Sequence, residues 1–160
     1  MSLYEARIIR MSLVYLVLTG ALGVLFYLFP TLMTYYRTTH IHLGVIGFFL
    51  SMVMGVAYWM MPRPGGLRQE RHEAVTFWLL NAGLILRFFA EPAWRYTGAG
   101  TFHTATVVSS LLLFGAILTF VNAMFARVQT SDTIRRMREV REAAARTGDE
   151  VTARRAPPLS

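Results

Sequence analysis

The sequence predicts an all-α integral membrane protein whose main part is a bundle of four transmembrane helices. Two observations carry this prediction: hydrophobic residues make up 54% of the 160-residue chain, and they gather in four long runs. A helix needs about 20 apolar residues in succession to cross the hydrocarbon core of a bilayer. The predicted spans cover about 11–29, 41–61, 74–94 and 104–125.

The arginines indicate how these helices lie in a membrane. All sixteen basic residues are arginines, and thirteen of them lie before the first run, between the second and third runs, or after the fourth. The other two connections hold one each, Arg37 and Arg95. Because positive residues mark cytoplasmic segments, we predict a multi-pass protein of a bacterial-type inner (plasma) membrane with both termini cytoplasmic. The net charge of +7 then suits contact with the lipid bilayer, and no nucleic acid is needed to explain it.

We expect two parts in the chain, a transmembrane domain over 1–127 and a basic cytoplasmic tail over 128–160. Arginines alternate with apolar residues in the first half of the tail, which predicts a basic C-terminal cytoplasmic helix on the inner leaflet up to about residue 146. The remainder is polar and contains proline, so we predict that it is disordered. The first run, 11–29, carries no candidate ligand, and its predicted role is packing.

The second run begins with two histidines, His40 and His42. In an α-helix these positions point about 200° apart, so they cannot easily bind the same metal ion. The face of His40 continues with small residues, and a flat group or another helix can approach the backbone closely there. These residues are Gly44, Gly47, Ser51 and Gly55. A histidine above such a face supplies what a porphyrin needs, an axial nitrogen and room for the macrocycle.

Residues 40–62 contain the pattern His40-x-His42-x-Gly44-x-x-Gly47, followed by Gly55, Tyr58 and Pro62. This pattern resembles the tenth helix of haem-copper oxidase subunit I, in the branch of the cytochrome-cbb-type oxidases and the bacterial nitric oxide reductases. The four runs are also similar to the last four helices of that subunit. The resemblance implies haem b as cofactor, with His40 as the ligand of the high-spin haem and His42 as that of the low-spin haem.

The third run contains charged residues, which are costly inside a membrane and usually pair with one another or face a cavity. Arg87 and Glu91 are four residues apart on one helix face, so we expect a mutual ion pair, a propionate clamp by Arg87, or a proton path through Glu91. Arg37 lies one turn before the first histidine and is either a membrane anchor or a partner of a haem propionate. Arg95, in the outer aromatic belt, is a further candidate for binding the cofactor.

His103 lies in the first turn of the fourth run. Counted from the predicted cytoplasmic ends at 1.5 Å per residue, His40 and His103 both come out at about 32 Å. We therefore predict that they share one haem iron in a six-coordinate, low-spin site suited to electron transfer. If His103 is only an interfacial residue, the iron has one histidine and an open position that binds nitric oxide or carbon monoxide.

Composition limits the possible functions. The chain has no cysteine, which excludes disulfides, iron–sulfur clusters, c-type haem attachment and thiol nucleophiles. Its four histidines cannot supply both the haem and the copper sites of the family, so a complete oxidase or reductase is not expected from this chain alone. One remaining function is a haem b protein for electron transfer, haem handling or diatomic-gas binding in respiration or denitrification. The other is a haem-free accessory or assembly subunit; either form is expected in a homo-oligomer or a respiratory or denitrification complex.

Overall fold

Six helical segments follow one another in the computed structural model, which describes residues 2–61, 70–125, 127–128, 136, 139–140 and 142–145. They are α1 (Leu3–Leu28), α2 (Pro30–His42), η1 (Leu43–Leu50), α3 (Ser51–Met60), α4 (Glu70–Thr97) and α5 (Gly100–Phe125). Because α2, η1 and α3 continue without a break, they form one long helix of 31 residues, Pro30–Met60. We call it the second rod, because it is the second of the four long helices. The described residues thus contain four helices long and apolar enough to cross a membrane, which confirms the predicted all-α class and the number of long apolar helices.

The chain divides into two units, Met1–Arg127 and Val128–Ser160. All six helical segments belong to the first unit. The helix predicted up to residue 146 and the disorder predicted after it fall mainly outside the described residues.

All four long helices begin before the predicted spans, and two of these early starts have visible causes. Ser2 caps α1, because its hydroxyl accepts a hydrogen bond from the Glu5 N–H (3.1 Å) and its own N–H donates to the Glu5 carboxylate. The second rod begins at Pro30, whose fixed φ and missing N–H suit a first helical turn. His40 and His42 consequently lie in the interior of a continuous helical rod rather than at its head.

A π-helix, η1, follows directly after the two histidines. The N–H of Ser51 bonds to the carbonyl of Ile46, five residues back, and the Ser51 hydroxyl donates to the same oxygen (2.9 Å). A π turn holds more residues than an α turn, so each residue rotates the chain less. The glycine face predicted at 100° per residue nevertheless stays against α1, because Gly44, Gly47 and Gly55 all meet side chains of that helix. Short π segments inside α-helices are frequent at functional sites.

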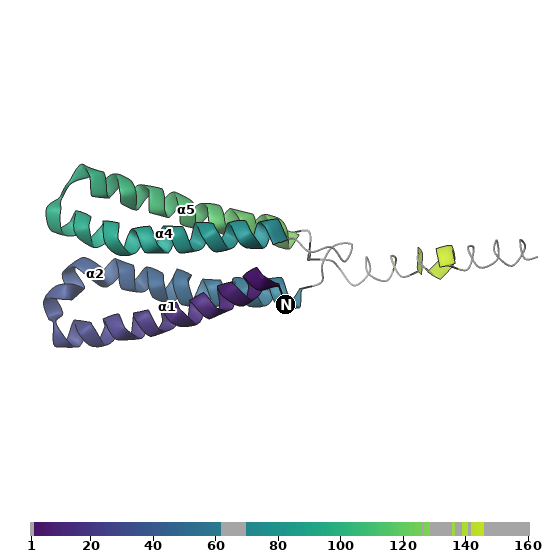
Figure 1. Ribbon diagram of the computed structural model, residues 1–160, viewed down its shortest axis with the longest axis horizontal. Helices are drawn as coiled ribbons and strands as arrows, with labels where there is room; N and C mark the ends of the chain where they lie inside the picture. The colour runs from purple at the N-terminus through teal and green to yellow at the C-terminus, as the bar shows by residue number, and fades with distance from the viewer. Residues whose placement is uncertain are drawn as a thin grey trace, which may run out of the picture. The chain divides into compact units, whose positions relative to one another are not determined.

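Two antiparallel helical hairpins make up the bundle (Figure 1). In the first, α1 packs along the rod from Pro30 to Met60, and in the second, α4 packs along α5 after a turn in which Gly98 has a φ of 69°. Glycine suits this turn because it has no Cβ to oppose the left-handed conformation. The hairpins meet where α1 and α2 contact α4. A buried apolar cluster at their contact comprises Tyr15, Leu22, Leu43, Met54, Leu80, Leu84, Leu113 and Ala116.

The glycines of the second rod let α1 approach its backbone closely. A Cβ added to Gly47 would lie 2.9 Å from Cγ of Tyr15, and one added to Gly55 would lie 2.7 Å from an isoleucine side chain of α1. A Cβ on Gly44 would lie 3.3 Å from a methyl group of Thr19. Of the two occupants expected for this face, a flat group or another helix, the structure places another helix, α1.

Replacing Gly47 by alanine tests this close packing. Tyr15 would have to move or the helices to separate, and such overpacking costs about 1–3 kcal/mol. Alanine is favoured over glycine in a helix by ~1 kcal/mol, and this gain applies equally at Gly20. We expect Gly47→Ala to lower the free energy of unfolding, measured by denaturant titration in detergent micelles, by about 1–3 kcal/mol relative to Gly20→Ala. Gly20→Ala is the matched control, because a Cβ there has nothing within 4 Å, and equal effects of the two changes would contradict the packing.

Candidate functional site

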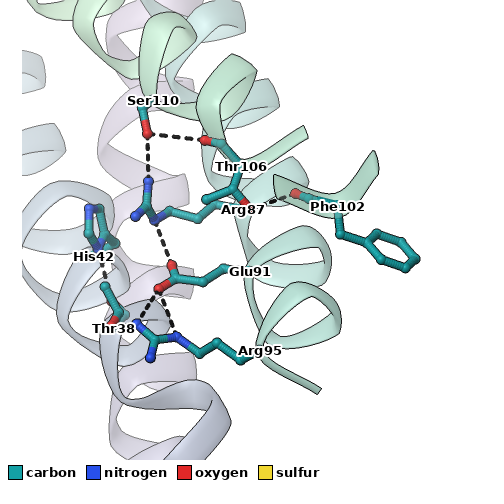
Figure 2. Close-up of polar contacts among 8 residues, drawn as sticks. All are labelled: Thr38, His42, Arg87, Glu91, Arg95, Phe102, Thr106 and Ser110. Atoms are coloured by element: carbon teal, nitrogen blue, oxygen red, sulfur yellow. Dashed lines mark hydrogen bonds and ion pairs between the residues drawn. The ribbon is translucent and has the colours of Figure 1, made fainter. Parts of the chain in front are cut away.

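The imidazole of His42 is held in one orientation by the backbone of its own helix. Its Nδ1 lies 2.8 Å from the carbonyl oxygen of Thr38, one turn earlier (Figure 2). A carbonyl oxygen only accepts hydrogen bonds, so the neutral ring carries its proton on Nδ1 and keeps its lone pair on Nε2. Metal-binding histidines commonly donate their other ring N–H to a carbonyl or carboxylate in this way. The tautomer of His42 therefore suits an Nε2 ligand.

A buried carboxylate on α4, that of Glu91, joins two arginines of the same helix. Arg87 Nε lies 2.9 Å from Glu91 Oε2, while Arg95 donates to Glu91 Oε1 from Nε (3.3 Å) and Nη2 (3.2 Å). The Glu91 side chain is only 3% exposed, and a buried charge of this kind needs such partners. The ion pair predicted from the spacing of Arg87 and Glu91 is confirmed. Arg95 joins this pair because α4 continues through Pro92 to Thr97, which keeps all three charged side chains on one helical face.

This ion-pair cluster connects three helices (Figure 2). Arg95 Nη2 donates to the hydroxyl of Thr38 on α2 (2.8 Å), and Arg87 Nη1 donates to the hydroxyl of Ser110 on α5 (2.9 Å). Thr38 also binds His42 through its carbonyl oxygen, so a line of polar contacts runs from the imidazole across α4 to α5. The cluster fixes the position of α2 against α4 beside His42.

His40 lies on another face of the second rod, against α1. Its ring packs edge-on against Phe26, with the ring centroids 5.3 Å apart, and its Cε1 would lie 3.7 Å from a Cβ on Gly23. Its Nδ1 is buried and has no hydrogen-bond partner among the described residues. The separation of about 200° predicted for His40 and His42 fits these different neighbours, because one ring meets α1 and the other lies one turn from the α2–α4 contact.

His103 stands exposed in the first turns of α5, and its ring lies 4.8 Å from that of Trp94 on α4. No contact within the described residues links it to His40, whose ring neighbour is on α1. The structure therefore does not bring together the two side chains predicted to share an iron. The described residues also contain no group of three or more His, Cys, Asp or Glu side chains able to hold a metal ion.

Whether a haem fits depends on the face it would occupy. Gly44 and Gly47 make room for Thr19 and Tyr15 of α1, so a macrocycle cannot lie on them while this helix is in place. The chemistry of His42 does fit an axial ligand, and its ring is partly exposed. The residues thus fit a haem ligand on the face of His42 and leave no room for a macrocycle over the two glycines.

Arg37 is separate from the ion-pair cluster. It is exposed and lies on a surface pocket of about 580 Å³, to which Arg95 also contributes. The other lining residues are Pro30, Met33, Thr34, Thr38 and Ile41. Arg37 makes no ion pair or hydrogen bond with any described residue. Of the three arginines predicted to bind the cofactor, it is the one whose guanidinium has no protein partner among the described residues.

A second buried polar cluster, which is not predicted from the sequence, lies where α1 and α4 begin and α3 and α5 end. Arg127, which follows α5, lies with its Nη2 3.4 Å from Glu73 Oε1 and donates from Nη1 to the carbonyl oxygen of Tyr58 (2.8 Å). Ser2 donates from its hydroxyl to the other oxygen of Glu73 (2.5 Å), and Glu5 in turn binds the Ser2 backbone. The charged side chains of this pair are fully buried. Ser2 and Glu5 form a capping box recognisable from spacing, but their long-range partners have no local signal.

A third polar contact joins the two hairpins between these clusters. The Tyr15 hydroxyl donates to Oδ1 of Asn81 (2.6 Å), and the Asn81 amide donates to the carbonyl oxygen of Phe77 (2.7 Å). Tyr15 is the residue that also covers Gly47, so the position of α1 is set from both sides. This contact explains why the polar amide of Asn81 is tolerated in an otherwise apolar part of α4.

No protein-family model matches the chain, and comparison with curated proteins and with solved structures also finds no match. The resemblance to haem-copper oxidases consequently rests on the sequence of this chain alone, on its histidine–glycine pattern and its four apolar runs. The functional proposal has to be supported by the geometry of His42 and its neighbours.

Removing the charge of Arg127 tests the buried cluster that this residue forms with Glu73. Arg127→Gln leaves the carboxylate of Glu73 buried without its cation, and breaking a buried pair in this way typically costs about 3–5 kcal/mol. We expect a fall of that size in the free energy of unfolding, measured in detergent micelles. Arg10→Gln is the control: it removes the same charge, but from an exposed side chain on α1. A stability loss no larger than that of the control would show that the cluster does not hold the helices together.

Proposed function

We propose that the chain is a multi-pass protein of a bacterial-type inner membrane, with both termini on the cytoplasmic side. Four helices long and apolar enough to cross a bilayer support insertion. The arginines support the orientation, because thirteen lie on one side of the predicted spans and two on the other. In this orientation both hairpin turns, at Phe29 and Gly98, face the outside.

Within this membrane protein we propose a haem b site with His42 as the axial ligand. The observation that carries the proposal is the contact of His42 Nδ1 with the Thr38 carbonyl oxygen, which leaves Nε2 as the free lone pair. A bound haem iron would supply one-electron transfer or binding of a diatomic gas. The residues of the chain would hold the imidazole in a fixed orientation, since Thr38 is itself tied to Arg95 and Glu91. The role is that of a respiratory or denitrification component without a copper centre.

The geometry favours one histidine ligand over the pair of His40 and His103, which is predicted from their similar height along the two helices. His40 is packed between Phe26 and Gly23 of α1, and the ring of His103 packs at a tilt against Trp94. Within the described residues, neither ring has a contact with His42 or with Thr38, which holds it. A site with one protein ligand leaves the opposite position of the iron to a second subunit or to a small molecule such as nitric oxide or carbon monoxide.

A second candidate function is a haem-free accessory or assembly subunit of a respiratory membrane complex. The observation that favours it is the close packing of α1 against the second rod, because Thr19 and Tyr15 cover the glycine face on which a haem was expected. A bundle closed in this way needs no cofactor for its own packing. It would act by presenting its lipid-facing side chains to partner subunits.

Histidine substitutions decide between these functions. The protein purified in mild detergent from haem-replete cells is expected to show a Soret band, and His42→Ala is expected to abolish it because the iron loses its axial nitrogen. His40→Ala and His103→Ala serve as matched controls and should keep most of the pigment per mole of protein. Loss of pigment in His40→Ala with full pigment in His42→Ala would refute the proposed ligand. A colourless wild-type protein that is folded and haem-replete would favour the accessory subunit.

Cysteine labelling tests insertion and orientation, and the chain has no cysteine to interfere. Gly100→Cys places a thiol beyond the turn between α4 and α5, where an added Cβ meets nothing within 4 Å. We expect a membrane-impermeant maleimide to label it in intact cells. Ser160→Cys should react only after the cells are permeabilised. The reverse labelling pattern would invert the proposed topology.

A further inference from the structure

Charge is unbalanced at the hairpin end of the bundle, which we define as the end that contains the turns at Phe29 and Gly98. Three arginines belong to it, Arg37, Arg87 and Arg95. Glu91 is the one acidic residue between Glu73 and Asp132 in the sequence, and there is none between Glu5 and Glu70. At this end of the bundle the long helices therefore supply a single carboxylate, that of Glu91, against three guanidinium groups. An external anion would balance the remaining charge.

The excess charge faces a pocket of suitable chemistry. Arg37 and Arg95 both line the surface pocket of about 580 Å³, together with the hydroxyl-bearing side chains of Thr34 and Thr38. Glu91 and Thr38 hold the Arg95 guanidinium in place, while 40% of its side chain remains exposed. Arginines with fixed N–H donors recognise phosphate and carboxylate groups well, because they can bind two oxygens at once.

Two further features of the pocket point to a lipid as the source of the anion. Met33 and Ile41 give its wall an apolar part, and both are about half exposed (47% and 49%). In a bilayer-spanning bundle the hairpin end lies at the level of the headgroups, beside the start of the acyl chains. The first turn of α2, at Pro30, also has no side-chain cap, and the positive end of the helix dipole adds to the potential there.

We propose that this pocket, lined by Arg37, Arg95, Thr34 and Thr38, binds the phosphate of an anionic phospholipid headgroup. The inference rests on the membrane insertion of the proposed function and is independent of the haem. Bound lipid would neutralise the charge that Glu91 leaves unbalanced and would bridge the first hairpin, through α2, to the second, through α4.

The test compares nanodiscs of phosphatidylcholine alone with nanodiscs that also contain phosphatidylglycerol. Ligand that binds only the folded state raises its melting temperature, and we expect phosphatidylglycerol to raise the Tm of the wild-type chain by about 3 °C or more. Arg37→Gln should lose at least half of this shift, because Arg37 has no described protein partner to lose. Arg10→Gln, an exposed arginine near the start of α1, should keep the full shift. An equal shift in both variants, or none in the wild type, would overturn the proposal.

Three additional measurements separate the possible failures. Inorganic phosphate added to lipid-free micelles should not reproduce the shift, and if it does, the site is one for free phosphate and the lipid proposal is wrong. If Arg37→Gln loses Soret absorption while the lipid shift is unchanged, the arginine holds a haem propionate instead. If cysteine labelling places the protein outside the membrane, the proposed function itself fails; correct insertion without a lipid shift overturns this inference alone.

Discussion

The close contact between α1 and the second rod is the constraint on which the rest of the bundle depends. Helices that are apolar on most faces gain little from meeting one another in a bilayer, since lipid tails are equally apolar. Their arrangement must then come from close backbone approach and from polar contacts. Tyr15 supplies both, because its ring covers Gly47 and its hydroxyl binds Asn81 of the other hairpin. The same tyrosine thus positions α1 and joins the two hairpins.

Buried charge then locates α4 within the bundle. This helix carries Glu73 near its start and Glu91 toward its end, and each carboxylate is met by an arginine. A buried carboxylate without a cation is strongly destabilising, so both ends of α4 are tied to particular neighbours. Arg127 connects the start to the segment after α5 and to the carbonyl of Tyr58 on α3, and Arg95 connects the end to α2. One helix therefore organises contacts that reach every other long helix.

Much of the fold could be predicted because its causes are local. The length of each apolar run sets the number of long helices, and the i, i+4 spacing of Arg87 and Glu91 is enough to predict their ion pair. The rest depends on partners far apart in the sequence. The burial of Glu73 against Arg127 and the tilted ring contact of His103 with Trp94 have no periodic signal. The π-helix η1 has none either, although the glycines within and beyond it still face α1.

Small residues beside a histidine have two possible uses that exclude each other. A glycine face can admit a macrocycle or a neighbouring helix, and in this chain Thr19 and Tyr15 occupy it. A haem ligated by His40 would require α1 to leave that face, at the cost of the contacts around Tyr15. Ligation by His42 would not require α1 to move, because its ring is held by the Thr38 carbonyl on a face other than the one α1 covers. The histidine that could ligate a haem without rearrangement of the bundle is therefore His42, whose partner Thr38 is tied to the ion pairs of α4.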